Sequence, residues 1–413
     1  MHTDQQVRVL YSFPHKLGGR QIDSIAWHHV AGLKAAGADV LVHPGAIHTD
    51  VPAGIKVQPT LARGKFRIPY RLLGRIRALA LHDWIVARRL EKLGRQIDIV
   101  HTWPMAALQT LRVAKRLGIA SVLERPNAHT KYAYEVTQKE NERLGIVPPR
   151  GYSHTYNEQI LRKEEQEYDL ADHLMCPSDF VLRTFLDEGF PREKLVRHQY
   201  GFSQETHYPD IKVRKTQRGL TVLFAGACTP RKGLHFALAA WLQSPASANG
   251  TFFVVWEYLP GYPEKLAAML AHHSIKVLGF RRDLPELMRS SDVLVLPSIE
   301  EGSALVTSEA RGCGCVLAVS EASGAYCTHM ENALVHKVGD VNTLAQHFTM
   351  LHEDRALLER LRSASLRTVQ EITWPAAGVR LLQVYRDILR ADRKARNMER
   401  DTQLNGRNEV LVR

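Results

Sequence analysis

The chain has 413 residues, more than a single compact core usually holds, so two domains are expected. Hydrophobic residues make up 45% of the sequence and charged residues 24%, as in an ordinary globular enzyme. The five scattered cysteines do not suggest a disulfide framework.

The net charge of +12 favours anionic partners, such as nucleotide phosphates or an acidic lipid surface. No zinc-finger or RNA-recognition signature accompanies this charge, so we do not expect a nucleic-acid partner. No apolar run approaches the ~20 residues that span a bilayer. The N-terminal segment lacks the apolar stretch of a signal peptide, and the expected location is therefore cytoplasmic.

The first half of the chain alternates strands with helices, which predicts an α/β fold with a parallel sheet. The first strand is expected over Val7–Phe13, followed by a glycine turn at Gly18-Gly19 and a helix to about Ala36. Further strands are expected over 38–43, 97–101, 120–124 and 174–178, and a charged helix over 157–170.

The segment 62–95 is basic and helix-prone, with arginines interleaved with apolar and aromatic side chains such as Trp84. This composition is typical of a helix that lies on a membrane surface, so peripheral contact with the inner face of an anionic membrane is one interpretation. The alternative is a pair of ordinary surface helices whose arginines face water.

A polar stretch, 203–218, has no apolar period and reads as a linker. A second alternation then begins with a strand over 220–226, and further strands are expected over 252–256, 315–320 and 333–335. Between the first of these strands and the next helix lies a small-residue loop that ends in Arg231, Lys232 and Gly233. A lysine just before a helix is placed to neutralise phosphate.

The most informative stretch is Ser298–Gly314, which follows the apolar strand 293–296. It predicts a strand, a tight loop at Gly302 and a helix N-terminus, where backbone N–H groups can hold phosphate. Glu301 in the loop and Glu309 in the helix flank this site. Carboxylates do not bind phosphate, but they accept hydrogen bonds from sugar or ribose hydroxyls, and a sugar nucleotide combines both kinds of group.

This stretch resembles the paired-glutamate motif of the family-4 retaining glycosyltransferases. The resemblance implies the GT-B fold, in which two doubly wound Rossmann-like domains face each other across a cleft and a C-terminal helix crosses back to the first. It also implies domains at about 1–205 and 206–375 and a crossover helix at 376–395, followed by a charged tail at 396–413. Beyond Arg390 the sequence is charged and mostly non-periodic, so we expect fraying or disorder there.

By the same resemblance, Glu301 contacts the transferred sugar and Glu309 the ribose. The loop pattern of that family matches here at Gly226, Lys232 and Gly233, but Ala227 stands where the family has arginine, and Arg231 could supply the missing cation. The residues expected to bind the donor are Gly19, Arg231, Lys232, Phe280, Arg281, Gly302, Ser303, Ala304, Leu305 and Glu309.

First-domain catalytic candidates are Glu124, at the end of a strand, and His129, five residues further on. Family members usually place a functional histidine soon after this strand, though in a different register. An imidazole could orient a hydroxyl and a carboxylate could take its proton. The structural alternative is that Glu124 pairs with Arg125 or another basic residue and that His129 caps the next helix.

The sequence thus predicts a retaining glycosyltransferase that moves a sugar from a UDP- or GDP-linked donor to a saccharide, lipid-linked or other hydroxyl acceptor, in the synthesis of a polysaccharide or other glycoconjugate. No Asp-rich metal loop is evident, so no essential metal ion is expected. A nucleotide-sugar epimerase of the same fold and a non-catalytic nucleotide-sugar-binding protein remain as alternatives.

Overall fold

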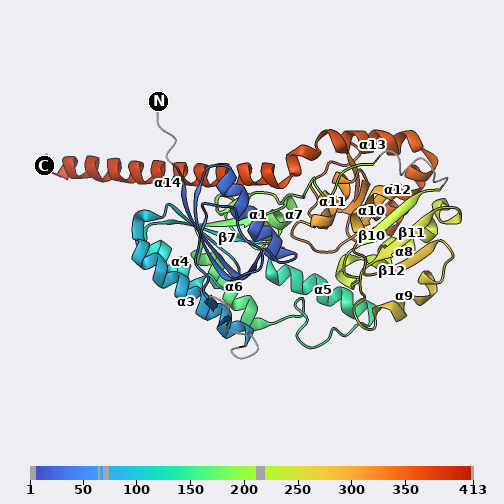
Figure 1. The fold of residues 1–413 in the computed structure, drawn as a ribbon, viewed down its shortest axis with the longest axis horizontal. Helices are drawn as coiled ribbons and strands as arrows, with labels where there is room; N and C mark the ends of the chain where they lie inside the picture. Colours follow the sequence, from blue (N-terminus) through green and yellow to red (C-terminus); the bar gives the residue numbers. More distant parts are fainter. Residues whose placement is uncertain (1–5, 64–65, 68–73, 211–218, 411–413) are drawn as a thin grey trace.

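In the computed structural model, residues 6–63, 66–67, 74–210 and 219–410 are described, with the side chains of 63, 66, 67 and 395–410 left out of the description. Two parallel sheets, each with helices on its faces, form two α/β domains (Figure 1). The predicted fold class of two doubly wound Rossmann-like domains is confirmed.

The first sheet has the strand order β3-β2-β1-β6-β7-β8-β9, and its strands pair in parallel. Its central strands are apolar because both faces are covered by helices. The strands are β1 (Arg8–Leu17), β2 (Asp39–Ile47), β3 (Lys56–Val57), β6 (Ile99–Thr102), β7 (Ala120–Glu124), β8 (His173–Cys176) and β9 (Leu195–Arg197). The helices are α1 (Ile22–Ala35), α3 (Arg75–Leu93), α4 (Leu108–Leu117), α5 (Thr130–Leu144), α6 (Glu158–Leu170) and α7 (Asp179–Asp187). A hairpin pairs β4 (Ala62–Arg63) with β5 (Phe66–Arg67).

The second sheet has the order β12-β11-β10-β13-β14-β15, again with parallel pairing. Its strands are β10 (Thr221–Ala225), β11 (Thr251–Val255), β12 (Ile275–Gly279), β13 (Val293–Leu296), β14 (Val316–Ser320) and β15 (Ala333–His336). Its helices are α8 (Leu234–Gln243), α9 (Tyr262–Leu270), α10 (Leu284–Ser290), α11 (Leu305–Gly312), α12 (Val341–Glu353) and α13 (Arg355–Arg367). Short 3₁₀ turns are η1 (Gly94–Gln96), η2 (Arg192–Lys194), η4 (Pro230–Lys232), η5 (Pro245–Ala248), η6 (Glu321–Ser323) and η7 (Val369–Ile372).

Strand β1 runs four residues past the predicted end at Phe13 and through Pro14. Its pairing with β2 shifts register between Phe13 and Lys16, and such an irregularity is where a sheet tolerates proline.

Two chain segments that connect the domains run side by side. The backbone N–H of Phe202 donates to the carbonyl of Ile372 (3.1 Å), and the N–H of Trp374 donates to the carbonyl of Phe202 (3.2 Å). A side chain on Gly201 would place its Cβ 2.5 Å from the backbone nitrogen of Trp374, so glycine is required for this close approach. The outgoing and returning connections therefore form one paired unit.

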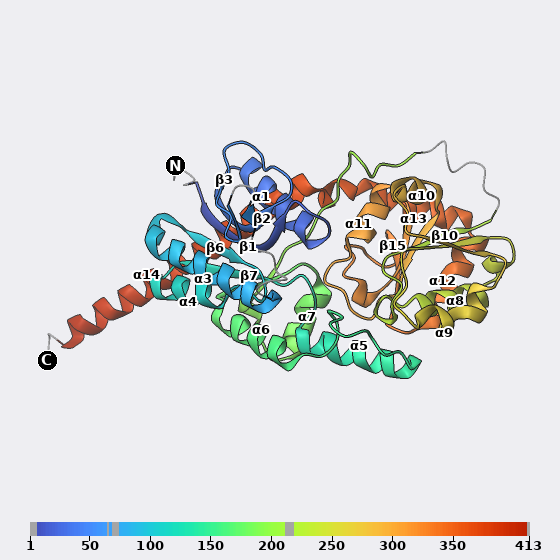
Figure 2. The same ribbon diagram turned by 60° about the horizontal axis from the view of Figure 1, so that its bottom comes forward.

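Helix α5 forms a third connection, because it leaves the first domain and reaches the second (Figure 2). Just after its end, Ile146 is buried in the hydrophobic core of the second domain. Within the helix, the Glu140 carboxylate lies 2.8 Å from Nε2 of His235, which stands on α8. These contacts fix the two domains against each other.

The long helix α14 (Trp374–Val410) crosses back over the first domain, where it packs on α1 (Figure 1). The crossing is tight, since a Cβ on Gly32 would lie 2.7 Å from Cα of Gly378, and the ring of His28 stacks on Trp374 at 4.3 Å. The helix continues to Val410, past Arg390, where the sequence predicts fraying. The many Ala, Arg, Lys and Glu residues in this stretch are strong helix formers, which explains the difference. Among the described residues, no helix is long and apolar enough to cross a bilayer.

Candidate active site

A pair of cations stands at the start of the second domain's first crossover. The turn η4 places Arg231 and Lys232 immediately before Gly233 and helix α8. Both side chains are largely buried, at 11% and 14% exposure. Burial lowers the pKa of Lys232, although the nearby Glu301 opposes this shift. A buried cation without a bound anion requires a counter-charge, and the loop after β13 supplies it.

Glu301 is the counter-charge for both cations. Its Oε1 lies 3.3 Å from Nη1 of Arg231 and forms an ion pair with Nζ of Lys232. Burial would raise the pKa of the Glu301 carboxyl, but Arg231 and Lys232 outweigh it and hold that pKa below its usual range. Glu301 is therefore ionised, and it occupies the cations that the sequence assigns to the donor diphosphate.

The neighbouring Glu300, which the sequence analysis did not single out, connects the domains. It accepts from Arg231 Nη1 at 3.1 Å and, through Oε1, from the backbone N–H of Ala128 at 3.1 Å. Glu300 therefore reaches the first domain, while the adjacent Glu301 pairs with Lys232. The only signal in the sequence was a second glutamate beside Glu301.

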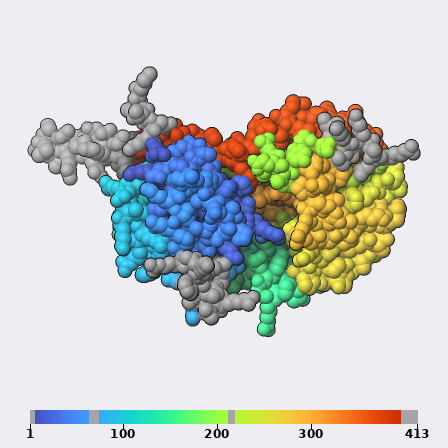
Figure 3. Space-filling view, viewed as in Figure 1, coloured from blue at the N-terminus to red at the C-terminus, as the bar shows by residue number. Residues whose placement is uncertain are grey.

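Gly302 is also an interdomain contact. A Cβ there would lie 1.6 Å from the carbonyl oxygen of Pro126, so only glycine fits. Its own carbonyl accepts from the hydroxyl of Ser178 at 2.5 Å. The expected donor loop is therefore seated directly on the first domain. The molecule is hollowed between the two domains on the face that Figure 3 shows.

Helix α11 begins at Leu305 with Ala304 as its N-cap, and Ser303 precedes it in the loop. The three were expected to offer backbone N–H groups to phosphate. The N–H of Ala304 donates instead to the carbonyl of Ser323 at 3.3 Å. Phosphate contact through that N–H would require this bond to break.

Glu309 lies one turn into α11 and is half-buried. Burial raises the pKa of its carboxyl to about 7. In the described part of the chain, no cation lies within ion-pair distance of this carboxylate. Its carboxyl loses its proton near neutral pH. The ionised form can then accept hydrogen bonds from the hydroxyl groups of a ligand.

A first-domain loop reaches the cation pair and was missed by the sequence analysis. Its side chains are Tyr152 and His154, whose rings lie 5.5 Å apart. Burial and the nearby Arg231 guanidinium lower the pKa of His154 to about 3, and Glu301 is close enough to oppose this shift. A neutral histidine of the first domain thus faces the site. The only signal in the sequence was two aromatic rings around a histidine in a polar loop.

Phe280 and Arg281, expected at the nucleotide base, follow β12. Phe280 is exposed at 42% and packs edge-on against Trp256, with ring centroids 5.1 Å apart. Arg281 pairs with Asp283, its Nε 2.8 Å from Oδ1. Trp256, directly after β11, adopts a positive φ of 120°, unusual for a residue other than glycine. This second ring was not predicted as part of the site.

Gly19 lies in the turn between β1 and α1. A Cβ there would lie 2.5 Å from Oδ2 of Asp23, and the preceding Gly18 has a φ of +83°. The turn therefore needs both glycines for its own shape. Contact of Gly19 with a donor stays a prediction.

Glu124 lies at the end of β7, as expected, but its side chain is fully buried rather than open to the cleft. It accepts from Nε2 of His198 at 2.9 Å and from the hydroxyl of Tyr200 at 2.7 Å. Arg125 instead pairs with Glu164 at 3.3 Å. The expected catalytic role of Glu124 does not fit this burial, and the structural alternative fits, with histidine as the partner.

His129 occupies the N-cap position of α5, and its ring is enclosed by Tyr168, Phe185 and Phe190 at centroid distances of 5.3, 4.9 and 5.7 Å. With 2% of its surface exposed, it cannot reach a bound sugar. Burial lowers the pKa of His129 to about 4, so it is neutral. The expected catalytic role of His129 is not supported, because the loop after β7 turns its ring into the domain.

Comparison with known proteins finds a family match in the second domain. Residues 219–354 match the family described as Glycosyl transferases group 1. The matched segment, called the group 1 domain below, contains Arg231, Lys232, Glu301 and Glu309.

Among curated relatives, an N-acetylgalactosaminyltransferase of Campylobacter jejuni that acts on N,N'-diacetylbacillosaminyl-diphospho-undecaprenol is 26% identical over 119 residues, covering 28% of this chain and 32% of that protein. The O-antigen chain mannosyltransferase B of Escherichia coli is 22% identical over 239 residues, covering 54% and 62%. The matches thus span less than two thirds of these relatives.

The solved structure of Anabaena HepE in complex with UDP and glucose superposes with a TM-score of 0.63 at 16% identity, covering 92% of this chain and 100% of that one. At this identity the likeness concerns the fold, which confirms the two-domain GT-B architecture.

The raised pKa of Glu309 gives a prediction for stability. Its carboxyl ionises near pH 4.5 when unfolded and at about 7 when folded. The unfolded state therefore loses this proton first, and stability falls as pH rises through that interval. Urea unfolding of wild type and Glu309→Gln should show the variant gaining relative stability between these pH values. A difference that does not change with pH would contradict the assigned pKa.

Proposed function

We propose that the protein is a glycosyltransferase that moves a sugar from a nucleotide-sugar donor to a hydroxyl acceptor, with retention of the anomeric configuration. One observation carries the proposal. The group 1 domain gathers a buried cation pair, an ionised glutamate and an unpaired glutamate on the loops that follow β10 and β13 and on α11. Diphosphate, sugar and ribose are the chemical groups that these side chains match.

The donor would bind by exchanging counter-ions. Its diphosphate would replace Glu301 as the ion-pair partner of Arg231 and Lys232. The Glu301 carboxylate would then accept hydrogen bonds from hydroxyl groups of the sugar. Glu309 would accept from the ribose, and Trp256 and Phe280 offer aromatic surface to the base. Charge-assisted hydrogen bonds of this kind are about twice as strong as neutral ones.

In the transfer, the bond between the anomeric carbon and the phosphate oxygen breaks and a bond to the acceptor oxygen forms. The acceptor proton goes to the departing phosphate. Arg231 and Lys232 would stabilise the charge that develops there, which is the largest requirement of the step. We propose that no metal ion is needed for it, because two protein cations already stand at the leaving group.

The acceptor class is proposed from the relatives, one of which acts on an undecaprenol diphosphate sugar. A lipid-linked or other saccharide acceptor in glycoconjugate synthesis fits this comparison, and it would bring the protein to a membrane surface.

The proposed function can be tested with nucleotide sugars. Thermal shift against UDP- and GDP-linked sugars should show one class that stabilises the protein, by roughly 2.7 kcal/mol at 100 times its dissociation constant. Glu309→Ala should lose this stabilisation, while Glu331→Ala, an exposed glutamate of the same domain, should keep it. Sugar transfer with retained configuration, followed by NMR of the product, completes the test.

Other outcomes separate the alternatives. A changed sugar nucleotide in the absence of acceptor would indicate an epimerase, and tight binding with no product from any acceptor would indicate a binding protein. Equal nucleotide affinity of wild type and Glu309→Ala would contradict the assigned ribose site.

We also propose that α3 contacts an anionic membrane. Its exposed side includes Ile76 and Trp84, at 47% and 52% exposure, and the guanidinium of Arg88 lies 5.7 Å from the Trp84 ring. A groove of about 200 Å³ beside it is lined by Arg88, Arg112 and Arg116 against one acid, Glu91. An apolar ring among arginines suits the boundary between lipid headgroups and acyl chains. Within the predicted basic segment, Arg89 does not face outward, because its guanidinium donates to the carbonyl of Gln58 at 2.7 Å. Residues 64–65 and 68–73 of that segment lie outside the described residues.

Vesicle sedimentation tests this contact. Wild type should bind phosphatidylglycerol vesicles, less so at high salt because the attraction is electrostatic. Trp84→Ala with Arg88→Ala should weaken binding severalfold, whereas Arg360→Ala, an exposed arginine of α13, should not. Equal binding to neutral and anionic vesicles would favour the solvated-helix alternative.

A further inference from the structure

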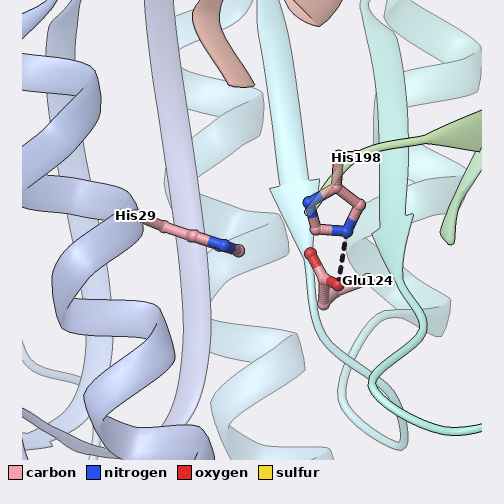
Figure 4. Close-up of side chains that lie close together, drawn as sticks. All are labelled: His29, Glu124 and His198. Carbon is pink, nitrogen blue, oxygen red and sulfur yellow. Dashed lines mark hydrogen bonds and ion pairs between the residues drawn. The ribbon is translucent and has the colours of Figure 1, made fainter. Parts of the chain in front are cut away.

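Three side chains from distant parts of the sequence converge inside the first domain. His29 projects from α1, Glu124 ends β7, and His198 follows β9 (Figure 4). One potential ligand atom from each lies within 4.8 Å of the other two. All three side chains are buried, with exposures of 2%, 0% and 2%.

The Glu124 carboxylate is fully buried, and its neighbours are histidines and a tyrosine. Its Oε1 accepts from His198 and Tyr200, and its Oε2 lies 3.4 Å from Nε2 of His101. No lysine or arginine pairs with it in the described part of the chain, and its Oε2 has no hydrogen-bond partner. A fully buried anion of this kind needs a positive partner close by.

His29 presents an unused nitrogen to this anion. Its Nδ1 lies 3.0 Å from the hydroxyl oxygen of Tyr11, which also accepts from the indole N–H of Trp103 at 2.9 Å. A phenol oxygen can accept both bonds, and His29 then carries its proton on Nδ1 and a bare lone pair on Nε2. That Nε2 is buried and has no partner. A metal ion at Nε2 requires this tautomer, in which Nδ1 donates to Tyr11.

We propose that His29, Glu124 and His198 form a binding site for a divalent transition-metal ion of the zinc class. Two imidazoles and one carboxylate are the ligand types of protein zinc sites. The ion would balance the charge of Glu124 and use the lone pair of His29. Tyr11 on His29 and Tyr200 on Glu124 are the outer hydrogen-bond partners that orient such ligands.

The site has a structural consequence because of where its ligands stand. His198 begins the segment that leaves the first domain through Tyr200 and Phe202, and His101, beside Glu124, bonds Tyr385 of α14 at 2.6 Å. A bound ion would link α1 and β7 to the segment that leaves the first domain after β9. The hydrogen bond between His101 and Tyr385 attaches α14 to the same cluster. The ion would thus stabilise the base of the interdomain connection and play no part in sugar transfer.

Metal analysis of the full chain tests the proposal. After expression with added Zn²⁺ and dialysis, mass spectrometry should find about one zinc per chain in wild type and in His336→Gln, a buried histidine of the second domain. His29→Gln and His198→Gln should lose it. Cobalt(II) added to the metal-stripped protein should give the visible d–d absorption of a nitrogen- and oxygen-ligated ion in wild type and His336→Gln, but not in His29→Gln or His198→Gln.

Stability provides a second measurement should the variants fold poorly. A chelator should lower the melting temperature of wild type, and added Zn²⁺ should restore it. Wild type that retains no zinc or cobalt, and whose melting temperature is indifferent to both chelator and Zn²⁺, would overturn the proposal. The cluster would then be a hydrogen-bonded core network in which a proton on a histidine balances Glu124.

Discussion

The ion pairing of Glu301 with Arg231 and Lys232 is the interaction on which the candidate site depends. It supplies the counter-charge for two buried cations, and it joins the loops that follow β10 and β13. Glu300 extends the same cluster to the first domain through Ala128, and Gly302 packs on Pro126. A ligand that replaced Glu301 as counter-ion would therefore act at the domain contact itself.

The first domain contributes in a different way from the one its sequence suggests. Its two predicted catalytic residues are turned inward, Glu124 to histidine and tyrosine and His129 to three aromatic rings. Glu124 holds the base of the interdomain connections, because Tyr200 belongs to the outgoing segment and His101 reaches Tyr385 of the returning helix. His154, on a loop that leaves the domain, is the histidine that faces the cations.

Much of the fold was predictable because parallel strands buried on both faces appear as short apolar runs, as at 120–124 and 293–296. The glutamates of the second domain were predictable because the strand, loop and helix that position them are contiguous in sequence. The direction of the His129 ring and the approach of His154 depend on how loops pack against distant elements, which local pattern does not encode. The continuation of α14 was missed because propensity, rather than apolar periodicity, sustains the helix beyond the first domain.

The counter-ion role of Glu301 is tested most directly by calorimetric titration of UDP and GDP into wild type, Glu301→Gln and the control Glu331→Gln. The amide keeps the shape of the side chain but removes the charge that competes with the diphosphate for Arg231 and Lys232. Glu301→Gln should bind the preferred nucleoside diphosphate severalfold more tightly than wild type, while the control should be unchanged. Weaker binding by Glu301→Gln would contradict it, because Glu301 would then be needed to hold the cations in place for the ligand.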